Sequence, residues 1–155
     1  MITTTSSSAV ATTEAVIHRY CSFRIAKQLY GVDISNVKEI NSEVAFTPVF
    51  HAPPQVRGYV NIRGQIHLVV DPREPLGLPP EATCEGKMLI VFKPTIGDNC
   101  AMLVDEIGDI INVPAANFEE DAQALDDGAL TTGVCKLDGQ LLVALSPRGF
   151  FHFKT

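Results

Sequence analysis

The sequence has little of what metal-binding, nucleic-acid-binding and membrane-spanning proteins need. It contains four cysteines in 155 residues, and no two of them form a C-x-x-C pair, so no zinc knuckle or redox dithiol is indicated. The 12 Lys and Arg residues are outnumbered by 18 Asp and Glu residues, and binding to nucleic-acid phosphates requires a clustered excess of cations. No apolar run approaches the roughly 20 residues of a membrane helix. We therefore expect no nucleic-acid partner and no direct membrane insertion.

Signatures of catalysis and of cofactor binding are also missing. The four histidines, at positions 18, 51, 67 and 152, have no metal-ligand spacing. The chain has no G-x-S-x-G nucleophile elbow, and no glycine-rich loop carries the Lys-Ser/Thr pair that holds a phosphate. We expect no cofactor, no metal and no catalytic residue. One alternative stays open, namely a two-barrel domain that binds a small molecule, or acts as an enzyme, between its lobes.

The chain changes in character near residue 20. Residues 1–18 are rich in Ser and Thr and lack the basic start and apolar centre of a signal peptide, so we interpret them as a flexible tail of a cytoplasmic protein. From Tyr20 onward, short apolar runs of period two alternate with Gly, Pro, Asn and Asp. This pattern predicts short strands with only brief helical turns.

One unit of the chain occurs twice. Residues 58–73 align without a gap with residues 133–148, at an offset of 133 − 58 = 75. Five apolar positions of the first copy remain apolar in the second: Val60, Ile62, Ile66, Leu68 and Val70 correspond to Cys135, Leu137, Leu141, Val143 and Leu145.

Each copy predicts a β-hairpin, because Arg63-Gly64 and Asp138-Gly139 are suited to a tight turn. We expect a loop longer than two residues, which would put all five apolar positions on one face and His67 on the outer face. About five short strands in each half predict an all-β protein made of two small barrels side by side. We place the first lobe at residues 19–80 and the second at 81–155, with the terminal segments free to cross between them.

Several motifs in this order resemble the CheW family of chemotaxis coupling proteins. In this sequence they are Tyr30-Gly-Val-Asp-Ile, Val37-Lys-Glu-Ile40, Thr47-Pro48, Ala52-Pro-Pro54, Gly58-Tyr-Val-Asn-Ile-Arg-Gly64, Val70-Asp71, Val104-Asp-Glu-Ile-Gly-Asp-Ile110, Gly133 and Leu141-Leu-Val143. The resemblance covers roughly residues 20–151. It implies two five-stranded SH3-like barrels around a shared hydrophobic interface, and no catalytic activity.

The resemblance also implies partners. In the family, one barrel binds the regulatory domain of a CheA-type histidine kinase, and the groove between the barrels receives the cytoplasmic tip of a methyl-accepting chemoreceptor. The chain would then be an adaptor in the cytoplasm, at the periphery of receptor arrays in the membrane. Flagellar chemotaxis and type IV pilus motility both remain open as its pathway.

Six residues are candidates for partner binding through the same resemblance: Arg63, Glu39, Val37, Asn61, Ile107 and Ile110. Arg63 is the arginine of the N-[LI]-R-G motif, and Glu39 is the acid of the V-x-E-I motif. Val37 would line the groove, and Asn61 would lie beside the arginine. The two isoleucines would belong to the kinase-facing barrel, although packing inside a small barrel would explain them equally well.

Two departures from the family pattern have structural consequences. The family usually continues from Asp71 with Leu-Arg, whereas this chain has prolines at 72 and 75, which remove backbone donors. We expect a stiffer exit from the first barrel. Residues 117–127 are acidic and predict a solvated loop.

Overall fold

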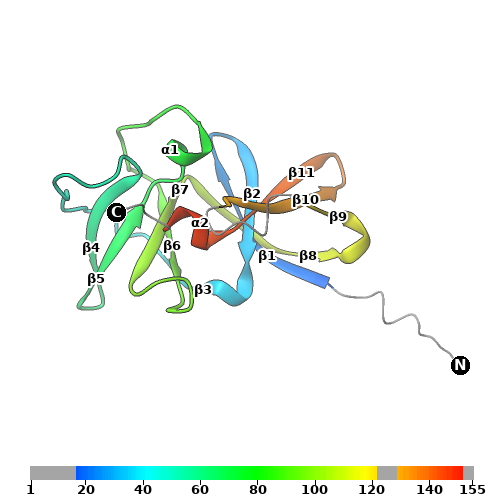
Figure 1. Cartoon of the computed structure of the whole chain (residues 1–155), viewed down its shortest axis with the longest axis horizontal. Coiled ribbons are helices and arrows are strands. Elements are labelled where there is room, and N and C mark those ends of the chain that lie inside the picture. Colours follow the sequence, from blue (N-terminus) through cyan, green and yellow to red (C-terminus); the bar gives the residue numbers. More distant parts are fainter. Residues whose placement is uncertain (1–16, 122–128, 152–155) are drawn as a thin grey trace, which may run out of the picture.

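The computed structural model describes residues 17–121 and 129–151 and contains two β-sheets (Figure 1). The strands are β1 (Ile17–Ile25), β2 (Gln28–Asp33), β3 (Val37–Asn41), β4 (Val56–Ile62), β5 (Gln65–Val70), β6 (Met88–Phe92), β7 (Cys100–Val104), β8 (Glu106–Pro114), β9 (Phe118–Glu120), β10 (Thr131–Leu137) and β11 (Gln140–Leu145). The helical turns are η1 (Ile34–Asn36), α1 (Arg73–Leu76), η2 (Ala115–Asn117) and α2 (Pro147–Phe150).

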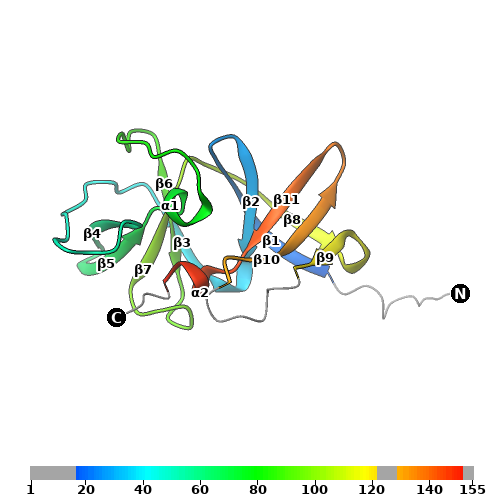
Figure 2. The ribbon, with the colours of Figure 1, turned by 45° about the horizontal axis from the view of Figure 1, so that its top comes forward.

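The strands form two lobes that lie side by side (Figures 1 and 2). A five-stranded sheet has the order β3-β6-β7-β5-β4, and a six-stranded sheet has the order β8-β1-β2-β11-β10-β9. The helical turns have only three or four residues each. The predicted fold class, all-β with two lobes and short helical turns, is confirmed, but only one lobe has the expected five strands. The other has six, because β9 adds to the edge of its sheet beside β10.

The sequence predicts that the two lobes divide at residue 80, but the sheets of the structure do not divide the chain there. Strands β6 and β7 join β3, β4 and β5, whereas β1 and β2 join the sheet of β8 to β11. Within each sheet one parallel pair, β5-β7 or β2-β11, joins strands that are not consecutive in the sequence. The Pro/Gly-rich residues 72–80 after β5, which have the composition of a linker between lobes, therefore lead back to the lobe of β5. One lobe comes from the middle of the chain, and the other from its two outer parts.

The repeat is present in three dimensions, with identical strand register. Tyr59 pairs with Leu68 in the first hairpin, and Val134 pairs with Val143 in the second, each 75 positions later. A short helix follows each hairpin, and both helices lie near the junction of the lobes (Figure 2). The internal duplication thus extends beyond the hairpins.

The predicted longer loop is wrong. Ile62 pairs directly with Gln65, so the turn has two residues. The two turn residues, Arg63 and Gly64, have φ angles of +54° and +83°, which are typical of a type I′ turn, whose twist matches that of the strands. The shorter turn exchanges the two faces of β5 relative to the prediction. His67 therefore points inward with 3% exposure, and Ile66 points outward with 54% exposure. His67 corresponds to the fully buried Leu142 of the second copy.

Both copies need glycine where the first strand of the hairpin bulges. Gly58 has φ +145°, and a Cβ there would collide with the backbone carbonyl of Thr47. A Cβ at Gly133, 75 positions later, would collide with the carbonyl of Glu119. Close approach of a neighbouring backbone therefore explains both glycines of the repeat.

The core has three parts, because most strands are covered on both faces. One cluster fills the five-stranded lobe and includes Val60, Ile62, Val69, Leu89, Val91, Ala101 and Leu103. A second fills the six-stranded lobe and includes Tyr20, Leu29, Val113, Cys135, Leu142 and Ala144. The largest lies between the lobes and takes alternate residues of both sheets, among them Phe23, Ile25, Val32, Val70, Ile90, Phe92, Met102 and Val104. This cluster is the predicted shared hydrophobic interface.

Two expectations about polar segments are corrected. Strand β1 begins at Ile17, two residues before the predicted start of the first lobe at residue 19, and residues 1–16 lie outside the described chain. Part of the acidic segment predicted as a loop, Phe118–Glu120, forms β9 and pairs with β10. The rest of that segment after Asp121, residues 122–127, is outside the described chain as well.

Candidate functional site

Two of the predicted site residues form an ion pair on the five-stranded lobe. The Nε of Arg63 donates to the Oε2 of Glu39 at 3.1 Å and to its Oε1 at 3.3 Å. Arg63 lies at the tip of the β4-β5 hairpin, and its side chain is 77% exposed, against 20% for Glu39. The carboxylate is thus held in place while the guanidinium keeps most of its surface in solvent.

The turn itself fixes the position of Arg63. Its φ of +54° is unusual for a residue with a side chain, and the turn is supported by Asn61, whose Oδ1 accepts a hydrogen bond from the N–H of Gly64 at 2.9 Å. Asn61 therefore has a structural role here. The repeat has Asp138 at the position of Arg63, and Asp138 does not adopt a positive φ, so the two hairpins share their strand register but differ in the conformation of the turn.

A β-bulge in β3 separates the roles of Val37 and Glu39. Val37 pairs with Phe92, but Glu39 pairs with Val91, so one extra residue lies between them on β3. In a regular strand Val37 and Glu39, which are two residues apart, would point to the same face. The bulge instead sends Val37 toward the core between the lobes and Glu39 toward Arg63. Val37 stays half-buried at the edge of that core.

Glu39 is ionised at neutral pH. The hydrogen bond from Arg63 lowers the pKa of its carboxyl more than partial burial raises it, and a hydrogen bond from Asn41 lowers the pKa further. The ion pair is therefore charged on both sides under physiological conditions.

An apolar surface that the sequence analysis missed adjoins the ion pair. Tyr59 and Ile66 lie on the outer face of the same hairpin, with exposures of 41% and 54%, and Ile66 pairs with Asn61. Exposed aromatic and aliphatic groups around a charged side chain are typical of protein–protein contacts. A two-residue turn, if assumed from the sequence, would have placed Ile66 outward.

The remaining candidates, Ile107 and Ile110, lie on β8 in the other lobe, away from the ion pair (Figure 1). Ile107 packs against the core between the lobes, whereas Ile110 is 53% exposed. Only Ile110 presents a large free surface.

A cluster of charged residues at the junction of the lobes was not predicted. Asp105, which connects β7 to β8, accepts two hydrogen bonds of 2.8 Å from Arg73 and one of 2.6 Å from Lys87. Its Oδ2 also accepts the N–H of Ala26, in the β1-β2 turn, at 3.0 Å. The side chains of Arg73 and Lys87 are only 6% and 7% exposed, and Glu81 completes the cluster by pairing with Lys87. Asp105 thus ties elements of both lobes together.

The described residues 17–121 and 129–151 contain no group of three or more His, Cys, Asp and Glu residues suited to holding a metal ion. No helix in the same ranges is long and apolar enough to cross a membrane. The chemically distinct features of this part of the chain are surfaces and ion pairs.

Comparison with known proteins agrees with this geometry. The chain is 28% identical to the chemotaxis protein CheW of Rhizobium meliloti (strain 1021) over 123 residues, which cover 78% of this chain and 79% of that protein. It is 31% identical to the chemotaxis protein CheW of Bacillus subtilis (strain 168) over 98 residues, covering 63% and 62%. Its fold matches the crystal structure of the scaffolding protein TtCheW from Thermoanaerobacter tengcongensis with a TM-score of 0.73 and 24% identity, covering 83% of this chain and 88% of that one.

The family described as CheW-like domain matches residues 19–154. That match includes both hairpins of the repeat, the ion pair and the junction cluster. The chain therefore belongs to the CheW-like domain family, the non-catalytic scaffold proteins of chemotaxis.

Proposed function

We propose that this chain couples chemoreceptors to a CheA-type histidine kinase, in chemotaxis or a related motility pathway, and works in the cytoplasm beside receptor arrays. The observation that carries the proposal is the pairing of Arg63 with Glu39 at the tip of the first hairpin. Both residues occupy motif positions that belong to the binding surface in the family.

The exposed hairpin suits a protein interface. Binding hot spots combine arginine with aromatic and apolar groups that lose water on contact. Here Arg63 lies on the hairpin that also exposes Tyr59 and Ile66. Glu39 orients the guanidinium, which lowers the entropy lost when a partner immobilises it.

The boundary between the lobes offers a second surface. Ile34, Val37 and Ile40 pack against the core between the lobes from η1 and β3, and each remains half-buried. Half-buried apolar side chains at the rim of a core suit an apolar helix tip as partner. We assign this rim to the receptor tip, and the exposed Ile110 on β8 to the kinase.

The repeat supplies a matched pair of variants for the test. Arg63→Asn removes the cation but keeps a residue that tolerates the positive φ found there. Asp138→Asn places the same residue at the corresponding position of the second hairpin, where φ is not positive. Each purified variant is titrated with the kinase regulatory domain and with a receptor-tip fragment, with thermal melts in parallel.

We expect wild type and Asp138→Asn to bind both partners, and Arg63→Asn to lose about 30-fold in affinity for at least one of them, as for a hot spot of about 2 kcal/mol. Equal binding by both variants would remove Arg63 from the interface. Failure of the wild-type chain to bind either partner would contradict the proposed function.

A further inference from the structure

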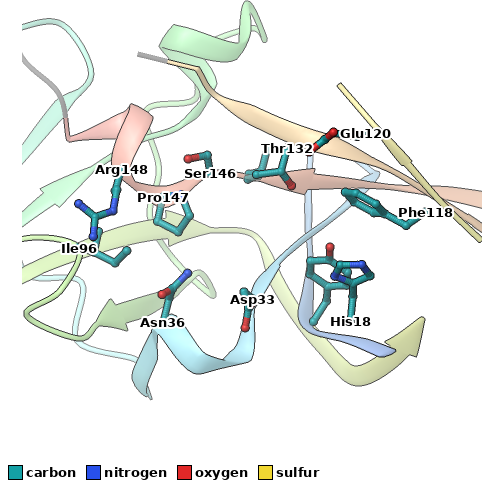
Figure 3. A pocket seen from close by; sticks show the side chains of 12 residues that line it. His18, Asp33, Asn36, Ile96, Phe118, Glu120, Thr132, Ser146, Pro147 and Arg148 are labelled. Atoms are coloured by element: carbon teal, nitrogen blue, oxygen red, sulfur yellow. The ribbon is translucent and has the colours of Figure 1, made fainter. Parts of the chain in front are cut away.

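A pocket of about 380 Å³ opens on the six-stranded lobe, at its border with η1 and α2 (Figure 3). It is lined by His18, Tyr20, Asp33, Asn36, Ile96, Phe118, Glu120, Thr132, Leu145, Ser146, Pro147 and Arg148. None of the partner-binding candidates lines this pocket. Its volume lies in the range of small-ligand and side-chain sites in proteins.

Aromatic rings form one end of the pocket. The rings of His18 and Phe118 lie 4.6 Å apart and those of His18 and Tyr20 lie 6.0 Å apart, measured between centroids. Burial, together with the neighbouring Cys135, raises the pKa of the Tyr20 hydroxyl, so this side chain is a neutral phenol at physiological pH. These faces are electron-rich surfaces that attract cations.

Two carboxylates line the same pocket. Asp33 accepts hydrogen bonds from the N–H and the hydroxyl of Ser35 through Oδ1, which leaves Oδ2 without a partner in the described part of the chain. Glu120 is exposed and forms no ion pair or side-chain hydrogen bond within the described ranges. Free carboxylate oxygens therefore lie in a pocket that also has a wall of aromatic rings.

The charges in the pocket are separated along its length. Among the described residues that line the pocket, Arg148 is the only Arg or Lys, and it has no ion pair with the described residues. Figure 3 places it beside Ile96 at one end, whereas Phe118 and His18 lie at the other. A guanidinium at the aromatic end would meet carboxylates and rings without meeting Arg148.

We propose that the aromatic end of this pocket accepts the guanidinium of an arginine side chain presented by a protein partner. A planar guanidinium stacks on aromatic rings and donates to carboxylates at the same time, which an ammonium does less well. Arg148 at the opposite end then pairs with an acidic residue near that arginine in the partner. The net charge of −6 favours the approach of such a cation.

The test is a titration of the ¹⁵N-labelled full chain, followed by NMR, with N-acetyl-L-arginine amide. N-acetyl-L-citrulline amide is the matched probe, because it has nearly the same shape and no charge. Glu120→Gln and Phe118→Leu alter the aromatic end of the pocket, and Arg148→Gln is the control within the pocket. Glu85→Gln removes an exposed carboxylate elsewhere.

We expect saturable shifts from the arginine probe at His18, Phe118 and Glu120, and none from citrulline. Glu120→Gln and Phe118→Leu should each weaken binding by about threefold or more, as loss of an ion pair or a cation–π contact does. Arg148→Gln and Glu85→Gln should not weaken it. Equal shifts with citrulline, shifts that map outside the pocket, or unchanged binding by Glu120→Gln would overturn the proposal.

Discussion

Asp105 provides the sharpest test of how the two lobes are held together. Its carboxylate neutralises two cations from the five-stranded lobe, Arg73 and Lys87, and accepts the N–H of Ala26 from the other lobe. Asp105→Asn keeps the size of the side chain but removes its charge. Two nearly buried cations are then left with Glu81 as their only acidic partner in the described part of the cluster.

The magnitude follows from burial. Removing one partner of a buried ion pair typically costs about 3–5 kcal/mol, because the other charge remains desolvated. That is a large share of the roughly 5–15 kcal/mol by which a domain is stable. At about 2–4 °C per kcal/mol for a chain of this size, Tm should fall by roughly 6–20 °C. Adding Arg73→Gln should cost less than the sum of the two single changes, because the double variant no longer leaves this guanidinium unpaired.

The loss of stability in Asp105→Asn should depend on pH. Burial by itself would raise the pKa of the Asp105 carboxyl, but the hydrogen bonds from Arg73, Lys87 and Ala26 lower it well below its ordinary 3.8. A depressed pKa stabilises the folded state at pH values above 3.8, and this stabilisation is lost as pH falls toward the folded-state pKa. The difference in Tm between wild type and Asp105→Asn should therefore be full near neutral pH and shrink in acid.

The control is Asp98→Asn, an exposed acid in the loop between β6 and β7 that forms no ion pair with the described residues. A substitution at such an exposed site changes the free energy of unfolding by about 0.5 kcal/mol or less. Thermal melts by circular dichroism compare the variants. If Asp105→Asn melts within the range of this control, the cluster does not hold the lobes together.

Three further predictions test the fold. Leu142→Ala should lower the free energy of unfolding by about 2–5 kcal/mol and the neighbouring Leu141→Ala by far less, because the two-residue turn buries Leu142 and leaves Leu141 53% exposed. Equal losses of the two variants in urea unfolding would mean that the register is wrong. Gly58→Ala should destabilise by more than about 1 kcal/mol, because its φ of +145° and the nearby Thr47 carbonyl exclude a Cβ, and an unchanged melting curve would contradict this. His67→Leu, which copies the residue of the second repeat, should preserve or increase stability in the same assay, and a loss above about 1 kcal/mol would show that the imidazole is required.

The positions of the strands could be predicted from the sequence. Which side chains of the hairpins point inward could be predicted only in part. The 75-residue offset identified both hairpins, because apolar positions and turn glycines recur at fixed spacing. The prediction for the inward face of β5 is wrong, because it assumes that Ile66, Leu68 and Val70 all point to one side, which requires a loop longer than two residues. Apolar residues on both faces of a strand defeat that reasoning. Here Val69 faces the core of one lobe and Val70 the core between the lobes.

The division into lobes could not be predicted, because it depends on contacts distant in sequence. The Pro/Gly-rich stretch after β5 has the composition of a linker. Arg73 and Lys87, on either side of it, nevertheless bind the same carboxylate, and the chain returns to the sheet that it left. An arginine and a lysine 14 positions apart carry no local signal for a shared partner.

The candidate site was predicted as separate residues, and the structure places only some of them together. Arg63 and Glu39 came from motifs 24 positions apart and lie in direct contact. Asn61 supports the turn, and Ile107 packs against the core. The β3 bulge that turns Glu39 toward Arg63 has no signature in the sequence, because any residue can occupy an extra position in a strand.

The central claim, that this chain couples receptors to a kinase, is tested most directly by reconstitution. Kinase autophosphorylation is measured with membranes that contain the cognate receptor, with and without the chain, and with Arg63→Asn beside its control Asp138→Asn. We predict that receptor control of the kinase requires the chain, that Asp138→Asn supports it fully, and that Arg63→Asn reduces it at concentrations where wild type is saturating. Receptor control of equal strength without the chain would contradict the account.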